Sequence, residues 1–167
     1  MQTFLPFADF KDSALVLDRA RLGKQRLEAK QIIMTLEDIT PHRGWQHHPA
    51  VRMWRGHTEV LALYGLVVCM EWRRRGYVDN MLSFFALRVP KQDFSVPWWI
   101  GYEPFHLSHQ SNLVRKLPSY YQRFFPDVPD DLGYFWPTAE SQVESWEPMN
   151  EVDVQSDASQ QIERILQ

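Results

Sequence analysis

Hydrophobic positions along this chain recur mostly at spacings of three and four residues, which is typical of helices that bury one face. Strict alternation of apolar and polar residues, the mark of a half-buried strand, does not stand out. The spacing predicts helices over residues 12–38, 50–75, 79–87 and 105–117, followed by a short aromatic helix or turn at 119–125. The expected fold class is mainly α, a compact single-domain helical bundle with long irregular loops.

The first predicted helix contains LDRARLGKQRLE, residues 17–28. At about 100° per residue, a helix places Arg21, Gln25 and Glu28 on one narrow stripe, with Lys24 at its edge. Apolar residues lie on both sides of this stripe, which predicts a helix packed on both flanks with its charged edge facing a cleft. A second polar stripe carries Arg19, Arg26 and Lys30.

The charges of this stretch are uneven. Five cations lie between residues 19 and 30, and Glu28 is the single acid among them. Such a field holds a carboxylate ionised and attracts a polyanion. Arg and Glu at helical spacing equally fit a solvated face with weak ion pairs, and the pattern alone leaves both interpretations open.

Composition favours one domain with a substantial core. The chain has 167 residues, of which 44% are hydrophobic and 14% aromatic. Its net charge of −3 is unevenly distributed. Residues 1–138 hold 17 basic and 14 acidic residues, a net +3, whereas residues 139–167 hold 1 and 7, a net −6. We expect a basic domain over 1–138 and an acidic tail over 139–167, partly disordered or a short helix.

The single cysteine, Cys69, lies within the apolar run of residues 61–70 and is expected to be a small buried hydrophobe. That run is far shorter than the ~20 residues needed to cross a bilayer, and the first residues lack the pattern of a secretory signal. We therefore expect a soluble cytoplasmic protein that has no membrane partner and is a monomer.

The sequence lacks the motifs of several common enzyme classes. The chain has no glycine-rich phosphate loop, no GxSxG and no CxxC pair. Four histidines, at positions 42, 47, 48 and 57, come close together in the sequence, but no soft ligand or HxxxH helical pair accompanies them. We expect neither a metal site nor a cofactor.

Basic residues interleaved with aromatic ones remain, at residues 21–26, 48–55 and 109–123. Cations bind phosphates, and exposed aromatic rings stack on unpaired bases. In a small helical protein, such rings are also common in the core. The candidate nucleic-acid contacts are Thr3, Arg21, Lys24, Gln25, Arg26, His48, Arg52, His109, Arg115, Lys116, Tyr120 and Tyr121.

Three blocks carry a resemblance to a known family: LDRARLGKQRLEA, GWQHHPAVRMWRG and FHLSHQSNLVRKLPSYYQRFFPDVP. Over roughly residues 1–137, the chain resembles the pyrimidine-dimer DNA glycosylases of bacteria and phages, the phage-type endonuclease V group. The resemblance implies a mostly helical domain whose N-terminal α-amine attacks C1′ of a damaged nucleotide and forms an imine, which is then cleaved by β-elimination. No cofactor is implied.

The same resemblance implies roles for particular residues. The catalytic glutamate of the family falls on Glu28, and Arg21 occupies the position of a base-contacting histidine. Residues 118–125 resemble the aromatic segment near the family's C-terminus. An α-amine suits the chemistry because its ordinary pKa, near ~8, leaves it partly neutral at neutral pH.

Two positions depart from the family pattern. Gln2 is bulky and should leave Met1 in place, so the nucleophile is expected to be the amine of Met1, or that of Gln2 if processing occurs, with Thr3 a distant third. The family often has arginine directly before the glutamate, where this chain has Leu27.

The expected function is therefore that of a DNA repair glycosylase with abasic-site lyase activity, excising damaged pyrimidines such as cyclobutane dimers from double-stranded DNA. Two alternatives stay open: the same fold acting on another modified pyrimidine, and a non-catalytic binder of distorted DNA.

Overall fold

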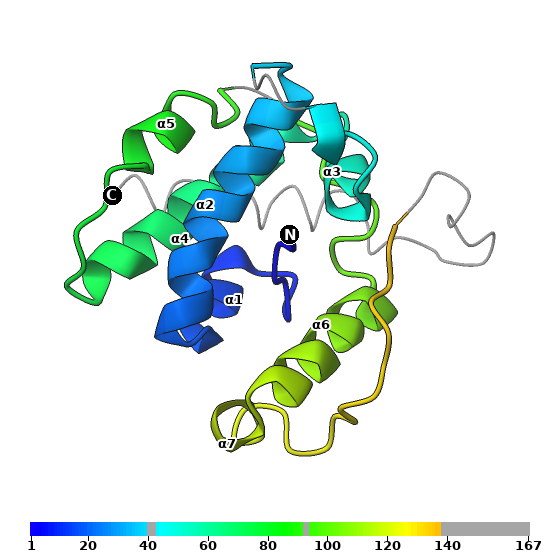
Figure 1. Ribbon diagram of the computed structural model, residues 1–167. Helices are drawn as coiled ribbons and strands as arrows, with labels where there is room; N and C mark the ends of the chain where they lie inside the picture. Colours follow the sequence, from blue (N-terminus) through cyan, green and yellow to red (C-terminus); the bar gives the residue numbers. More distant parts are fainter. Residues whose placement is uncertain (40–42, 92–93, 138–167) are drawn as a thin grey trace.

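The computed structural model describes residues 1–39, 43–91 and 94–137, and every regular element in these ranges is a helix. The predicted fold class, mainly α, is confirmed. The predicted domain boundary at residue 138 and the acidic tail lie outside the described residues. The helices in chain order are α1 (Phe10–Val16), α2 (Arg19–Leu36), the 3₁₀ turn η1 (Arg43–Trp45), α3 (Pro49–Met53), α4 (Thr58–Arg74), α5 (Leu82–Ala86), α6 (Glu103–Lys116) and α7 (Pro118–Tyr121) (Figure 1).

Helix α4 is the centre of the core. It packs against α2, α1 and α5, and all its residues from Val60 to Cys69 are buried. Gly65 makes the contact with α5 possible, because a Cβ at this position would lie 2.2 Å from the Phe85 ring. Cys69 is buried, as predicted. None of the helices in the described ranges is long and apolar enough to cross a membrane.

The prediction of one continuous helix over residues 12–38 is wrong. It breaks between α1 and α2, where the Asp18 side chain caps α2 by accepting from the main-chain nitrogens of Ala20 and Arg21 at 2.9 and 3.2 Å. The Arg75 guanidinium donates to three main-chain oxygens at the end of α1, including Leu17 O at 2.7 Å. These capping groups replace the hydrogen bonds that a continuous helix would have made.

The second predicted helix, 50–75, also divides in two. Helix α3 ends at Met53, and α4 begins only at Thr58. Between them Gly56 has a φ of 82°, a conformation that glycine adopts readily and side-chain-bearing residues do not.

The third helix is shorter than predicted. It spans α5 instead of 79–87, because the Asp79 carboxylate accepts from the main-chain nitrogens of Met81 and Leu82 at its start. Helix α6 begins at Glu103, two residues earlier than predicted, with Pro104 in its first turn. The aromatic segment forms the single turn α7, and no helix continues to residue 125.

The two stripes predicted on α2 have different environments. Aromatic rings cover the second stripe: Arg19 lies over Tyr77, Arg26 over Trp72 and Lys30 over Phe84. The prediction that both apolar flanks are packed is wrong in part. The flank with Leu22, Ala29 and Ile33 is core, whereas Ala20 and Leu27 on the other flank are exposed.

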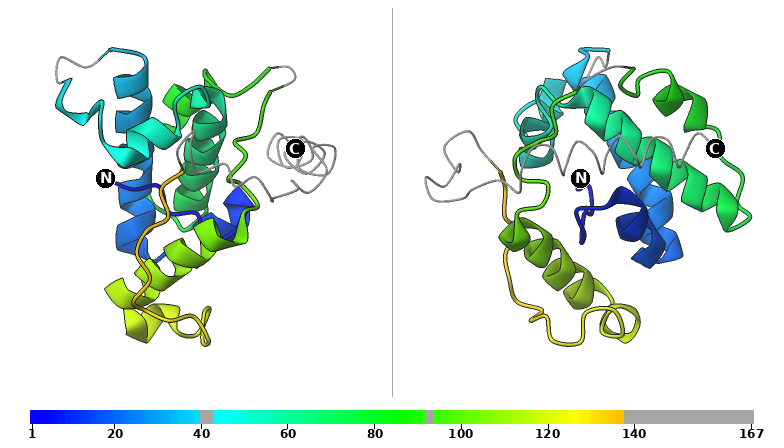
Figure 2. Two further views of the ribbon diagram at one scale, coloured as in Figure 1. Left: turned by 90° about the vertical axis from the view of Figure 1, so that its right-hand side faces the viewer. Right: turned by 180° about the vertical axis from the view of Figure 1, so that it is seen from behind.

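The N-terminal residues run without regular structure between α2 and α6 (Figures 1 and 2). Residues 2–5 are buried, although they begin the chain. The helices therefore surround the start of the polypeptide, and Met1 lies between α2 and α6.

Candidate active site

Side chains from four helices hold the N-terminal segment. The main-chain groups of residues 2–7 bond to side chains of α1, α2, α4 and α6, in place of a neighbouring strand. Extended buried backbone is costly unless its polar groups find partners. The segment is therefore fixed almost residue by residue, and the position of the terminus follows from it.

Gln25 on α2 makes the closest connections. Its Nε2 donates to the carbonyl of Gln2 at 3.0 Å, and its Oε1 accepts from the main-chain nitrogen of Phe4 at 2.8 Å. The Tyr64 hydroxyl lies 2.8 Å from the same Oε1 and 2.9 Å from the Phe4 carbonyl. Gln25 is 1% exposed. Its carboxamide thus pairs with the main chain of the N-terminal segment as a neighbouring β-strand would.

Two histidines of α6 hold Leu5. His109 Nδ1 accepts from the Leu5 main-chain nitrogen at 3.1 Å. His106 Nε2 accepts from Gly101 N, so its Nδ1 carries the proton and donates to the Leu5 carbonyl at 2.8 Å. Burial, with a smaller contribution from His106, lowers the pKa of His109 to about 3, and burial likewise lowers the pKa of His106. Both rings are therefore neutral at neutral pH, as these bonds require.

Two further side chains complete the support. The indole nitrogen of Trp54 donates to the Thr3 hydroxyl at 2.9 Å, and Gln110 Nε2 donates to the Pro6 carbonyl at 2.7 Å. Because the helices on both sides contribute, the terminus cannot move far without breaking several buried bonds.

The terminus meets Glu28. The Glu28 carboxylate accepts from the Gln2 main-chain nitrogen at 3.2 Å and from Gln25 Nε2 at 3.3 Å, both through Oε2. Its other oxygen, Oε1, lies 4.0 Å from the α-amine nitrogen of Met1 and 3.4 Å from Lys24 Nζ. The Met1 side chain is only 5% exposed while the residue as a whole is half-buried, so its accessible part is the main chain that bears the amine.

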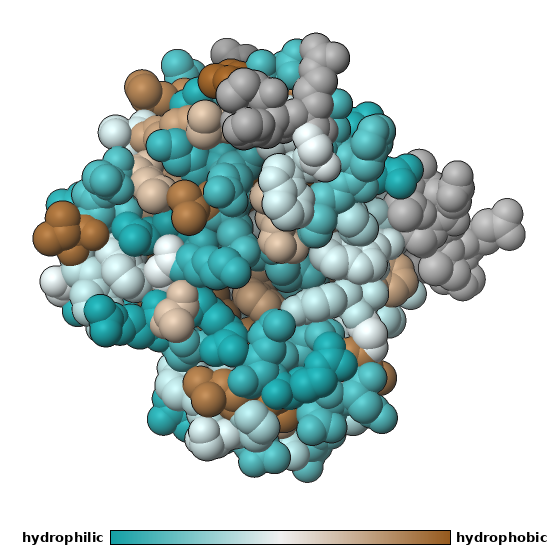
Figure 3. All heavy atoms as spheres, viewed as in Figure 1, coloured by the Kyte–Doolittle hydropathy of each residue, from teal (hydrophilic) through white to brown (hydrophobic). Residues whose placement is uncertain are grey.

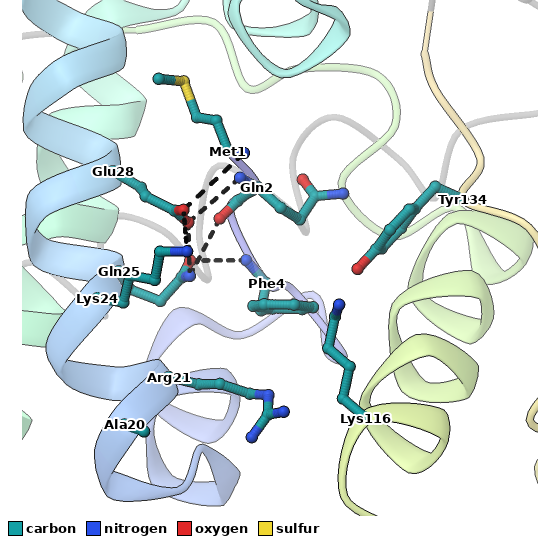
Figure 4. A pocket seen from close by; sticks show the side chains of 10 residues that line it. All are labelled: Met1, Gln2, Phe4, Ala20, Arg21, Lys24, Gln25, Glu28, Lys116 and Tyr134. Carbon is teal, nitrogen blue, oxygen red and sulfur yellow. Dashed lines mark hydrogen bonds and ion pairs between the residues drawn. The ribbon is translucent and has the colours of Figure 1, made fainter.

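A pocket of about 400 Å³ opens at this point, within the range of roughly 300–1,000 Å³ usual for small-ligand sites. On the face shown in Figure 3, the surface is hollowed near the centre, and most of the surrounding surface is hydrophilic. Figure 4 shows the lining: Met1, Gln2, Phe4, Ala20, Arg21, Lys24, Gln25, Glu28, Lys116 and Tyr134.

Three of the lining side chains are cations, Arg21, Lys24 and Lys116, which with the α-amine outnumber the one carboxylate. The Arg21 guanidinium pairs with Asp18 at 2.6 Å. Burial alone would raise the pKa of Asp18, but hydrogen bonds from Tyr121 and Arg21 outweigh it and hold that pKa below its ordinary value. Lys24 is 68% exposed, so its charge is available to a ligand at the mouth.

Aromatic rings form the other rim. Tyr134 lies 6.4 Å from Phe4 and 5.5 Å from Trp136, ring centre to ring centre. Trp136 in turn contacts His48, and His48 contacts Trp45, which is 49% exposed. Burial, and then the nearby α-amine, lower the pKa of His48. Phe4 and Tyr134 line the pocket itself, where their rings suit the face of a base, and the other rings continue the row beyond it.

The structure brings together seven of the residues selected from the sequence. Met1, Gln2, Arg21, Lys24, Gln25, Glu28 and Lys116 all line the pocket. Arg52, Arg115 and Tyr120 are exposed or half-buried outside this lining, and His48 belongs to the aromatic rim. These four residues therefore lie outside the pocket lining.

Other selected residues lie elsewhere. Arg26 pairs with Asp79 beneath Trp72. Thr3, His109 and Tyr121 are each 0% exposed. Thr3 and His109 hold the N-terminal segment, while the Tyr121 hydroxyl donates to Asp18 at 2.6 Å. Thr3, His109 and Tyr121 are therefore buried supporting residues, whereas the Arg26 guanidinium is paired away from the pocket.

Sequence reasoning missed Phe4 and Tyr134 in the pocket, and His106, Trp54 and Tyr64 in its support. For the helical residues, spacing gave one signal: His106 and His109 are three residues apart on one face of a helix, facing a common partner. Tyr134 lies in an irregular segment without periodicity, so no local pattern indicated it.

In the described ranges, no three His, Cys, Asp or Glu side chains gather as a metal site requires. His48 instead caps α3, accepting from Ala50 N at 3.1 Å, while His57 precedes α4. His42 lies outside the described residues.

Comparison with known proteins gives one match. The family model described as pyrimidine dimer DNA glycosylase matches residues 1–84, a segment that contains the terminus, Gln25 and Glu28. Neither the curated proteins nor the solved structures yield a match. The third block of the expected resemblance, in α6 and α7, falls outside the matched segment. This chain belongs to the pyrimidine dimer DNA glycosylase family, which gives it the role of a DNA repair glycosylase.

Proposed function

We propose that this protein is a DNA glycosylase with abasic-site lyase activity, whose nucleophile is the α-amine of Met1 and whose assisting acid–base group is Glu28. The observation that carries the proposal is the 4.0 Å separation between that amine and Glu28 Oε1 at the mouth of a cation-lined pocket.

The reaction begins when the neutral amine attacks C1′ of the damaged nucleotide. The bond from nitrogen to C1′ forms as the bond from C1′ to the base breaks, and the base leaves with the bonding electrons and takes up a proton. Loss of a proton from nitrogen and opening of the sugar ring give the imine. Such covalent catalysis replaces one difficult step by two easier ones.

The second stage cleaves the strand. A proton leaves C2′, a double bond forms between C2′ and C3′, and the bond from C3′ to the phosphate oxygen breaks with departure of the phosphate. Water then hydrolyses the imine and releases the amine. A carboxylate within reach of the imine can stabilise its positive charge and transfer these protons, and Glu28 lines the same pocket as Met1.

The surroundings of Glu28 favour this role. Its Oε2 already accepts from Gln2 N and Gln25, so the carboxylate is held in one orientation with Oε1 turned toward the amine and Lys24. Preorganised groups cost no reorientation at the moment of reaction.

Double-stranded DNA containing a damaged pyrimidine is the proposed substrate. Arg21, Lys24 and Lys116 surround the pocket mouth and can bind phosphates on either side of an extruded nucleotide. The Phe4 and Tyr134 rings also line the pocket, and an unstacked base can rest against them.

Borohydride trapping tests the proposal. The purified protein is incubated with a duplex containing one abasic site and reduced, and the covalent adduct is counted on a denaturing gel. The matched control is the same protein with two additional residues before Met1, which shifts the amine out of the pocket. Trapping by the native terminus and its loss in the extended protein are expected. Binding without any adduct would instead favour a non-catalytic binder of distorted DNA.

A further inference from the structure

The Gln2 side chain is the one feature of the pocket that the proposed chemistry leaves unused. Its main-chain nitrogen and oxygen are both bonded, to Glu28 and Gln25. Its carboxamide is different: Oε1 and Nε2 are both buried, and neither finds a hydrogen-bond partner among the described residues. Gln2 as a whole is 7% exposed.

The carboxamide belongs to the pocket. Gln2 is among the lining residues, and Figure 4 shows its side chain extending away from Glu28 toward the wall formed by Tyr134. Met1 and Glu28 lie on the α2 side of the pocket. The Gln2 carboxamide and the reacting amine of Met1 therefore point to different sides of the pocket, although they belong to adjacent residues. A nucleotide whose C1′ meets the amine would carry its base toward the carboxamide.

Buried polar groups in folded proteins nearly always have partners, and an exception calls for a reason. Relaxation cannot readily remove this one, because Glu28 and Gln25 fix the main chain of Gln2, and Trp54 holds the side chain of the next residue, Thr3. An apolar side chain of similar size would fill the same space and leave no donor or acceptor unpaired. The arrangement is that of a site completed by a ligand.

We infer that the Gln2 carboxamide is a specificity-determining residue that binds the imide edge of a pyrimidine, accepting from its N3–H and donating to the neighbouring carbonyl. This inference rests on the proposed function and names its substrate class. Saturation of the bond between C5 and C6 leaves the imide edge of thymine intact. The pocket would therefore accept thymine derivatives changed at C5 and C6, cyclobutane dimers included, provided that N3 carries its hydrogen.

Sites built around a polar contact discriminate strongly against ligands that lack the matching group, because their own buried donor and acceptor are then left unpaired. An abasic site has no base and cannot use this contact. Gln2 should therefore contribute to excision of a base and to preference for a lesion far more than to cleavage of an abasic site.

The test compares wild type with Gln2→Met, which keeps the side-chain length, removes both polar atoms and leaves a bulky second residue so that Met1 is retained. Mass spectrometry verifies the terminus. Two rates are measured for each protein: base release from a duplex with one thymine dimer, and borohydride trapping at an abasic-site duplex. We expect Gln2→Met to lower the ratio of the first rate to the second at least tenfold. The same substitution at the exposed Gln31 should leave the ratio unchanged.

Equal losses in both rates would overturn the inference, since Gln2 would then merely position the amine, and so would two unchanged rates. If the protein cleaves neither duplex, a binding measurement tests the role of Gln2 instead. Fluorescence anisotropy gives the affinity for the dimer duplex relative to a tetrahydrofuran abasic duplex. Wild type should prefer the dimer, and Gln2→Met should lose at least tenfold of that preference. Absence of trapping in wild type would contradict the proposed function alone, whereas absence of the preference would contradict the role of Gln2.

Discussion

The main-chain nitrogen of Gln2 donates a hydrogen bond of 3.2 Å to Oε2 of Glu28, and this bond ties the start of the chain to the middle of α2. Because one carboxylate oxygen is occupied in this way, the other remains for the α-amine at 4.0 Å and for Lys24 at 3.4 Å. The single carboxylate of the pocket thus both positions the terminus and faces it.

Glu28→Gln should abolish strand cleavage and change affinity for DNA by no more than a few fold. The amide oxygen can still accept from Gln2, so the terminus keeps its position, whereas the group that transfers protons and balances an imine charge is lost. Cleavage of an abasic duplex and anisotropy with the same duplex measure the two quantities. Glu59→Gln, an exposed acid in the first turn of α4, is the control. Full activity in Glu28→Gln would remove Glu28 from the mechanism.

Arg21→Ala and Lys116→Ala should each weaken binding and reduce the slope of log affinity against log salt by about 1, because each removes one phosphate contact. Arg26→Ala serves as the matched comparison. Although Arg26 lies on the same helix, it pairs with Asp79, away from the pocket. Its removal should leave the slope unchanged. A reduced slope for Arg26→Ala, or none for Arg21→Ala, would place the DNA on another face.

Arg26→Ala should instead lower the free energy of unfolding by about 3 kcal/mol. The Asp79 side chain is 0% exposed, and removing the partner of a buried ion pair leaves a charge uncompensated. The loss stays at the low end of the usual range because the main-chain nitrogens of Met81 and Leu82 still bond to Asp79. Urea unfolding measures it, and an unchanged midpoint would show that Asp79 finds solvent.

The buried histidines predict a loss of stability in acid. The pKa of His109 is lowered to about 3, below its value of ~6.5 in the unfolded chain. The unfolded state therefore binds more protons over the interval, and stability is lost as the pH falls from about 6.5 toward 3. His109→Asn keeps an acceptor for Leu5 and does not titrate. Its free energy of unfolding should change less with pH than that of wild type, and parallel curves would contradict the assignment.

Gly65→Ala should destabilise the fold by about 1–3 kcal/mol, the usual range for overpacking. The added Cβ would lie 2.2 Å from the Phe85 ring, where α4 and α5 are in closest contact. At Gly133 a Cβ would meet nothing within 4 Å, so Gly133→Ala should fall within about 0.5 kcal/mol of wild type. Thermal unfolding distinguishes the two variants. Equal midpoints would mean that α4 and α5 can move apart to accommodate the added Cβ without loss of stability.

Much of α2 could be predicted from the sequence, because helical periodicity is a local property. The stripe of Arg21, Gln25 and Glu28 does face a pocket, and Lys24 does lie at its edge. The breaks at Leu17 and Gly56 were missed because they depend on capping from elsewhere, such as Arg75 at the end of α1, and on a single backbone angle.

The route of the N-terminal segment could not be predicted in the same way. Apart from Ser13, six positions from Phe7, its partners are separated from it by between 21 and 104 positions, as for Gln25 with Phe4 and His109 with Leu5. No local pattern predicts which buried side chain will replace a neighbouring strand. The proximity of Met1 to Glu28 was expected from the family resemblance alone, and residue spacing contained no information about it.

The most direct test of the central claim is to locate the atom that carries the sugar after borohydride reduction with an abasic-site duplex. The trapped protein is digested with a protease and a nuclease, and the modified peptide is identified by tandem mass spectrometry. The account predicts a reduced sugar remnant on the α-nitrogen of the N-terminal peptide that begins with Met1. A remnant on the side chain of Lys24 or Lys116, the two other amines of the pocket, would contradict it.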